Sequence, residues 1–227
     1  MKTSSNEKKL HKAKESIKYF IISFIALIFF EIIAYFAFLN TIPEFLSRYG
    51  IWLLYLNISV ISIGLMIWYA LSYKSNVNCM TGMMIGMTFG MQTGMMIGAV
   101  VGATNGFFTG AMTGMILGVI VGALMGRCCG VMGVMEGLMA GVMGGTMGPM
   151  ISVMMFNDHL QFFMPFYFII NLIIVFGLGF MYYKEVVEPH EFPEKNIGLL
   201  TFTGAILLMA SIIILIMIYG PKSGLFQ

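Results

Sequence analysis

Long apolar stretches alternate with short polar segments along the whole chain. A helix needs about 20 predominantly apolar residues to cross the hydrocarbon core of a bilayer. Seven stretches come close to this length, so the sequence predicts an all-α polytopic membrane protein with about seven transmembrane helices. The expected spans are residues 19–39, 51–71, 80–103, 106–124, 130–156, 162–183 and 197–219.

Turn-forming residues divide the middle of the chain. The segment Thr104-Asn105-Gly106 predicts a break between the third and fourth spans, because Asn and Gly tolerate turn dihedrals. Arg127 predicts a break between the fourth and fifth spans. Pro149 cannot donate a helix hydrogen bond, so we expect it to kink or end the fifth span and to leave the stretch to Phe156 for the membrane interface.

Charged residues suggest an orientation. Six lysines lie within residues 1–18, before the first span. Cytoplasmic loops carry an excess of Lys and Arg, and a seven-span chain with a cytoplasmic N-terminus places 10 of the 12 basic residues inside. The C-terminus is then outside. The expected segments are a basic cytoplasmic stretch at 1–18, two flanking helices at 19–78, a Gly- and Met-rich helical core at 79–156, two further helices at 157–219 and a short tail at 220–227.

Composition narrows the class of protein further. Apolar side chains make up 59% of the chain, charged residues make up 10%, and the mean hydropathy is +0.92, so the expected environment is a lipid bilayer. A net charge of +2 provides no basic face for a nucleic acid. Three cysteines, two of them adjacent, exclude a disulfide-framework domain. In the expected topology all three thiols lie at the cytoplasmic rim.

Glycine recurs in the core segment with a spacing of four residues. It occupies every fourth position from Gly82 to Gly130 and resumes at Gly133, Gly137, Gly141 and Gly145. Small residues at this spacing let helix backbones approach closely in lipid. The repeat therefore predicts a glycine zipper in a central bundle of three helices, with Gly-x-x-x-Gly faces that also permit a homo-oligomer.

Methionine is concentrated in the same segment, which holds 18 of the 24 methionines. The residues form two ladders, one on the third span and one on the fifth, with a methionine at every fourth position. A thioether is a soft neutral ligand that suits Cu(I), and thiolates bind this ion more tightly. The candidate metal ligands are Cys79, Met80, Met83, Met87, Met91, Met95, Cys128, Cys129, Met132, Met135, Glu136, Met139, Met143 and Met147.

Packing offers a plainer interpretation of these methionines. Methionine is an adaptable filler beside glycine, although the flanking spans use Leu, Ile and Val for that purpose. Glu136 has three open roles: pairing with Arg127, gating a cation or acting as a charged ligand. Glu31, in the first span, is expected to hydrogen-bond Asn57 or Tyr35, or to carry a proton.

Two short motifs resemble those of a known family. Met83-x-x-x-Met87 and Gly106-x-x-x-Gly110 are similar to the membrane elements of Ctr-type copper transporters. The resemblance implies a ligand set for monovalent copper. It covers only these patterns, because that family has three spans per subunit, assembles as a trimer, places the two motifs on different helices and has a Met-rich N-terminus.

No catalytic motif is present, so we do not expect an enzyme. The sequence favours a membrane protein that binds or transports a soft metal ion, with Cu(I) as the expected ion and a copper chaperone or copper enzyme as its partner. The alternatives are a structural or assembly subunit of a membrane complex with no metal role, and a passive pore. The sequence does not separate a transporter from a metal chaperone.

Overall fold

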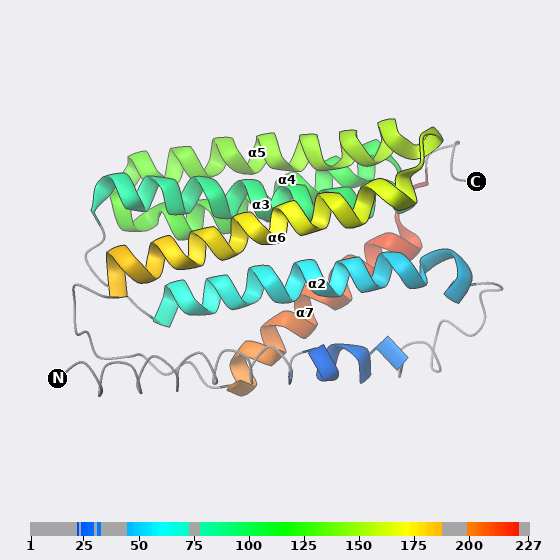
Figure 1. Cartoon of the computed structure of the whole chain (residues 1–227), viewed down its shortest axis with the longest axis horizontal. Helices are drawn as coiled ribbons and strands as arrows, with labels where there is room; N and C mark the ends of the chain where they lie inside the picture. The colour runs from blue at the N-terminus through cyan, green and yellow to red at the C-terminus, as the bar shows by residue number, and fades with distance from the viewer. Residues whose placement is uncertain are drawn as a thin grey trace.

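The computed structural model describes residues 22, 24–29, 31–32, 45–72, 78–187 and 199–222. Nearly all of these residues are helical, and this part of the chain contains no strand. Figure 1 shows the principal helices lying side by side along the long axis, with α7 inclined to the others. They are α2 (Phe45–Ser72), α3 (Cys79–Asn105), α4 (Phe107–Gly126), α5 (Gly130–Met154), α6 (Leu160–Tyr182) and α7 (Leu199–Tyr219).

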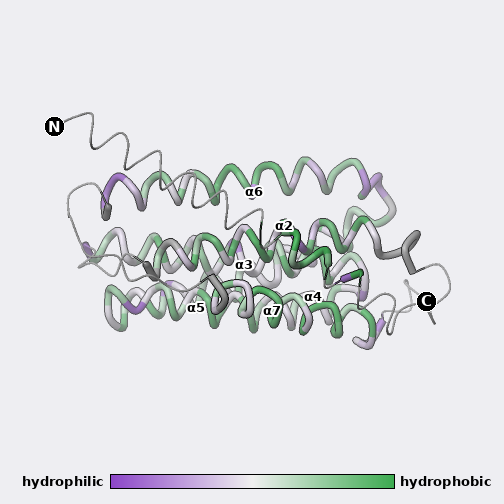
Figure 2. Tube along the Cα trace, turned by 90° about the horizontal axis from the view of Figure 1, so that it is seen from below, coloured by the Kyte–Doolittle hydropathy of each residue, from purple (hydrophilic) through white to green (hydrophobic). Residues whose placement is uncertain are grey.

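The helices have the length and composition of membrane spans. Within the described residues there are five apolar stretches of sufficient length, and one of them contains both α4 and α5. Hydrophilic residues gather toward the helix ends, while most of each helix is hydrophobic or neutral (Figure 2). The chain is therefore an all-helical integral membrane protein. The first expected span, residues 19–39, lies largely outside the described residues. The stretches are Gly50–Trp68, Cys79–Asn105, Phe107–Met154, Leu160–Glu185 and Thr201–Tyr219.

The two turns inside the core segment occur where the sequence predicts them. Helix α3 ends at Asn105, and Gly106 has a φ of 104°, a backbone conformation that favours glycine. A 3₁₀ turn over Arg127–Cys129 separates α4 from α5, and Gly130 follows it with a φ of 70°. These two predicted breaks are confirmed.

Pro149 is expected to kink or end the fifth span, and the second of these outcomes is wrong. Helix α5 continues through Pro149 to Met154 and is followed by a 3₁₀ turn at Met155–Asn157. The proline is buried against α3, where a Cβ atom added to Gly98 would lie 2.9 Å from its Cδ atom. The close fit of the ring against Gly98 shows how tertiary packing accommodates a residue that disfavours a helix interior.

Helices α3, α4 and α5 pack against one another through their glycines. Along the contact between α3 and α5, the residue numbers of both helices increase in the same direction, so these two helices are parallel. Along the contact between α3 and α4, the numbers increase in opposite directions, so α4 is antiparallel to both. A Cβ atom on Gly86 would lie 2.8 Å from the Cα atom of Gly126, closer than real Cβ atoms approach. Three of the glycine layers are Gly86, Gly126 and Gly133; Gly90, Gly122 and Gly137; and Gly94, Gly114 and Gly145.

The remaining helices cover α3 from the other side. Tyr55 of α2 stacks on Phe168 of α6 with ring centroids 4.7 Å apart, and most buried apolar residues of α2, α3, α6 and α7 belong to one core. Asn105 Nδ2, at the end of α3, donates hydrogen bonds to the carbonyl oxygens of Ile216 and Gly220 at the end of α7. Helix α3 is consequently the central helix, with glycine-lined neighbours on one side and side-chain packing on the other.

Candidate metal-binding surface

The two methionine ladders lie on the parallel helices α3 and α5. Gly144 of α5 packs against the backbone of Met91, and Gly148 packs against the backbone of Met95. Met143 and Met147 immediately precede these glycines in the sequence. One residue of an α-helix rises roughly 1.5 Å along the axis, so Met143 lies within about that distance of the level of Met91, and Met147 of the level of Met95. At these two rungs the fold therefore places a methionine of α3 level with a methionine of α5.

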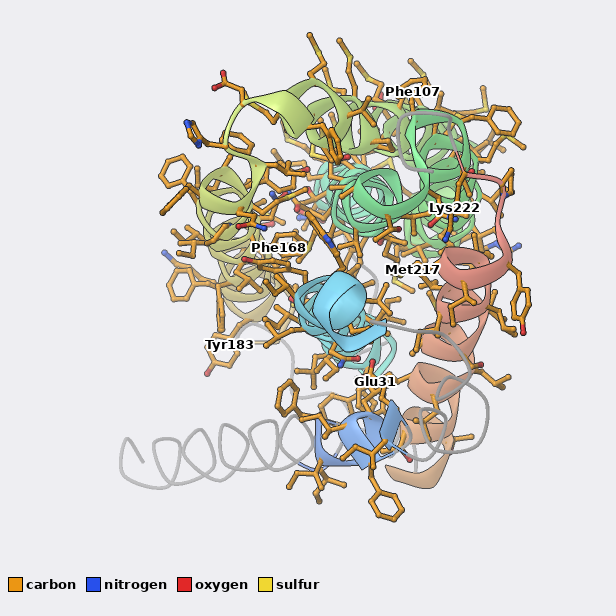
Figure 3. The ribbon with its side chains drawn as sticks, turned by 90° about the vertical axis from the view of Figure 1, so that its right-hand side faces the viewer. Glu31, Phe107, Phe168, Tyr183, Met217 and Lys222 are labelled. Carbon is orange, nitrogen blue, oxygen red and sulfur yellow. A yellow bond between two sulfur atoms is a disulfide. The ribbon has the colours of Figure 1, made fainter. Side chains whose placement is uncertain are left out.

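The ladder methionines lie outside the glycine-packed interior. On α5 the four ladder side chains are between 44% and 61% exposed, and on α3 Met87 is exposed while the other three are half-buried. Figure 3 shows sulfur-bearing side chains projecting outward from the edge of the bundle. The ladders thus occupy an outer surface of the helical bundle. The members are Met83, Met87, Met91 and Met95 on α3, and Met135, Met139, Met143 and Met147 on α5.

Three cysteines meet at one end of this surface. The first residue of α3, Cys79, and the last residue of the α4–α5 turn, Cys129, come together although 50 positions separate them, with Cα atoms 4.8 Å apart. The Sγ atom of Cys128 and the Cβ atom of Cys129 would each lie 3.1 Å from a Cβ atom on Gly82. Met80 and Met132 are exposed at the same end.

The expectation of three thiols at this end requires correction. Cys79 and Cys129 form a disulfide, so Cys128 is the one free thiol among the described residues. The Cα separation lies within the range that a disulfide requires, because α3 begins beside the turn between α4 and α5. Cys128 Sγ donates a hydrogen bond of 3.2 Å to the carbonyl oxygen of Met125. In this oxidised form only one of the three predicted cysteine ligands is available as a thiol.

Polar side chains surround the cysteine end. Thr81 Oγ1 donates a hydrogen bond of 2.6 Å to Glu185 Oε2, which joins the π-helical turn Tyr183–Val187 after α6 to the beginning of α3. A carboxylate near the N-terminus of a helix interacts favourably with the helix dipole. Arg127 and Lys184 are also exposed at this end. The cysteine end of the bundle therefore carries charged side chains of both signs.

Glu136 lies one residue after Met135 on α5 and is half-buried. Pairing with Arg127 is one of the three roles that the sequence suggests for Glu136. The described part of the chain contains no ion pair between these two residues. One helical turn places Glu136 on the same face of α5 as Met132 and Met139. The only carboxylate of α5 is thus positioned among thioethers.

The described residues contain no group of three or more His, Cys, Asp and Glu side chains arranged to hold a metal ion. Any metal site here would depend on methionine sulfur. Sequence reasoning missed the Cys79–Cys129 pairing and the contact between Thr81 and Glu185. Neither contact is indicated by the neighbouring sequence, because the partners are 50 and 104 positions apart.

Comparisons with known proteins do not identify a relative. No known protein family, curated protein or solved structure matches this chain. The function is therefore inferred from the arrangement of the sulfur atoms and helices.

Proposed function

We propose that this chain is a membrane protein that binds Cu(I) on the outer face of α3 and α5, next to the three cysteines. The observation that supports the proposal is the parallel arrangement of α3 and α5, which brings the two methionine ladders level at Met91 and Met95. Thioethers are soft neutral donors that match Cu(I) and need no deprotonation in a low-dielectric setting. Glu136 supplies a negative charge near the bound cation.

The glycine-packed interior argues against an ion path along the axis of α3, α4 and α5. At Gly90, for example, an added Cβ atom would lie 2.7 Å from the carbonyl oxygen of Gly137 and 3.2 Å from the Cα atom of Gly122. A core that has no space for a methyl group has no space for a permeating ion. The proposed binding surface is therefore the outer face, and the passive-pore alternative loses support along this axis.

The cysteines contribute to the proposed site when they are reduced. We place their end of the bundle on the cytoplasmic side, because Arg127 and Lys184 lie there and the expected seven-span order puts this end on the same side as the lysine-rich residues 1–18. Cytoplasmic thiols keep most protein disulfides reduced. Two cellular thiol groups supply two electrons and two protons and are themselves oxidised to a disulfide, while the Cys79–Cys129 disulfide is reduced to two thiols beside Cys128.

Reduction is expected to strengthen copper binding. In the purified full chain, we expect the Cu(I) affinity measured against a competing chelator to rise at least about tenfold on reduction, since even outer-shell changes at metal sites have effects of this size. The double variant Cys79→Ser, Cys129→Ser should lose this increase and retain the weaker binding by methionine. Equal affinities for the oxidised protein, the reduced protein and the double variant would remove the cysteines from the site.

The orientation can be tested with the thiol of Cys128. Cys128 is exposed, so a membrane-impermeant maleimide should modify it in permeabilised cells and leave it unmodified in intact cells. A Lys222→Cys variant, at the opposite end of the bundle, is expected to react in intact cells. Modification of Cys128 in intact cells would place the cysteine end outside.

A structural or assembly subunit is the second candidate function. The observation that favours it is the same outward position of the ladders, because exposed methionines adapt readily to a partner helix. In that case the glycine zipper provides a rigid scaffold and the methionines bind no metal. The two candidates differ in copper content, which mass spectrometry of the purified protein measures.

A further inference from the structure

Glu31 and Asn57 form a hydrogen-bonded pair inside the membrane region, away from the sulfur-rich surface. Asn57 Nδ2 donates to Glu31 Oε2 across 2.9 Å, which confirms the pairing with Asn57 that the sequence suggests. Asn57 belongs to the apolar stretch Gly50–Trp68 and is only 3% exposed. Figure 3 shows Glu31 between the N-terminal helical segment and α2. The carboxyl group is therefore held at depth by a single amide.

The other two oxygen atoms of this pair have no partner among the described residues. Glu31 Oε1 and Asn57 Oδ1 are both buried and make no hydrogen bond. An ionised carboxylate accepts hydrogen bonds and donates none. If Glu31 is ionised, Glu31 Oε1 and Asn57 Oδ1 are therefore both acceptors without a donor. Buried polar atoms without partners are rare in native proteins and call for an explanation.

One proton on Glu31 gives both of these atoms a hydrogen-bond partner. A protonated carboxyl group carries an O–H donor, and an acid and a primary amide can join through two hydrogen bonds in a closed ring. The Asn57 Nδ2 to Glu31 Oε2 bond is one half of that ring. A proton on Glu31 Oε1 that donates to Asn57 Oδ1 completes the other half. The two unpartnered atoms are the two that such a ring requires.

The neighbouring helices provide no compensating charge. From Gly50 to Ser72, α2 contains no Asp, Glu, Lys, Arg or His, and α7 contains none along its whole length. Their titratable groups are the tyrosines Tyr55, Tyr69 and Tyr219. The described residues of the segment that carries Glu31 add no other charged group. A charged carboxylate in this setting is costly, whereas a neutral acid with both hydrogen bonds is not.

We propose that Glu31 is a proton-binding site within the membrane, held as a neutral acid in a two-hydrogen-bond ring with Asn57. Release breaks the O–H bond at Oε1 and transfers the proton to water, leaving a carboxylate that keeps the hydrogen bond from Asn57 Nδ2. No electrons are transferred, and each cycle changes the charge of the site by one. This property is independent of copper binding and gives the chain a group that exchanges protons at membrane depth.

A carbodiimide tests the protonation state directly, because this reagent modifies protonated carboxyl groups and spares carboxylates. In membranes that contain the full chain at neutral pH, we expect dicyclohexylcarbodiimide to modify Glu31, as detected by mass spectrometry of its peptide. Glu185, exposed at the rim, serves as the control and should stay unmodified. The modification at Glu31 should decrease as the pH is raised.

Infrared spectroscopy provides a readout that does not depend on reagent access. The carbonyl band of a protonated carboxyl group should lose intensity in Glu31→Gln, because this change replaces the carboxyl group by an amide of nearly the same shape that can also form a two-hydrogen-bond ring with Asn57. Asn57→Leu removes both ring bonds and should shift the Glu31 band to higher frequency. Glu136→Gln is the matched membrane control and should leave the Glu31 band unchanged. An unmodified Glu31 at neutral and acidic pH, together with identical carbonyl bands in the parent and Glu31→Gln, would overturn the proposal.

Discussion

Gly122→Ala is expected to destabilise the folded chain by about 3 kcal/mol or more, at the upper end of overpacking costs. An added Cβ atom would collide with the carbonyl group of Gly137 on α5 and would lie 3.0 Å from the Cα atom of Gly90 on α3. Both neighbours are backbone atoms, so no side-chain rotation relieves the contact. The helices would have to separate, which should lower the temperature of thermal unfolding in detergent and the fraction of monodisperse protein.

A matched control lies on α6. Gly177 has no atom within 4 Å of an added Cβ position, and it lies inside a helix. Gly177→Ala should therefore leave stability unchanged or raise it by about 0.5–1 kcal/mol, because alanine loses less conformational entropy than glycine on folding. If Gly122→Ala and Gly177→Ala unfold at the same temperature, the close packing of α3, α4 and α5 does not exist in the protein.

Replacing a whole methionine ladder by leucine should separate metal binding from packing. Leucine is close to methionine in volume, and such exchanges usually cost less than about 1.5 kcal/mol even in a packed core. The α5 ladder is exposed, so its replacement should leave folding intact while removing most Cu(I) binding, measured by chelator competition on the reduced protein. The same result is expected for the α3 ladder. The changes are Met135, Met139, Met143 and Met147 to Leu in one variant, and Met83, Met87, Met91 and Met95 to Leu in the other.

Helix α4 provides the control for this experiment. Met112 and Met115 lie on α4 and belong to neither ladder, so changing both to Leu should preserve copper binding. Copper binding that survives in both ladder variants, with folding preserved, would assign the ladder methionines to packing. The structural-subunit candidate would then be the better account of the chain.

The sequence was informative where the signal is local. Gly106 and Arg127 mark the turns because backbone freedom and polarity act within a few residues. The sequence also narrowed the partner of Glu31 to Asn57 or Tyr35, since a buried carboxyl group needs a donor, and the structure shows Asn57. These predictions required a short-range rule or a short inventory of polar groups.

The sequence was uninformative where the outcome depends on how helices are arranged. Cys79 pairs with Cys129 because α3 begins at the level of the α4–α5 turn, and this follows only from the antiparallel packing of α4 against α3. Pro149 illustrates the same limit, since a residue that disfavours helix interiors is retained inside α5 by its fit against Gly98. Likewise, spacing alone could not tell whether the ladders face inward or outward.

The glycine contacts also determine where the molecule can move. Backbones that touch without intervening side chains have no rotamers to adjust, so α3, α4 and α5 must shift as one stiff unit. The outer helices α2, α6 and α7 contact that unit through side chains such as Tyr55 and Phe168, which can repack. Motion is therefore confined to the boundary between the two groups of helices. Glu31 reaches α2 on the mobile side of this boundary, whereas the methionine ladders are fixed to the stiff unit.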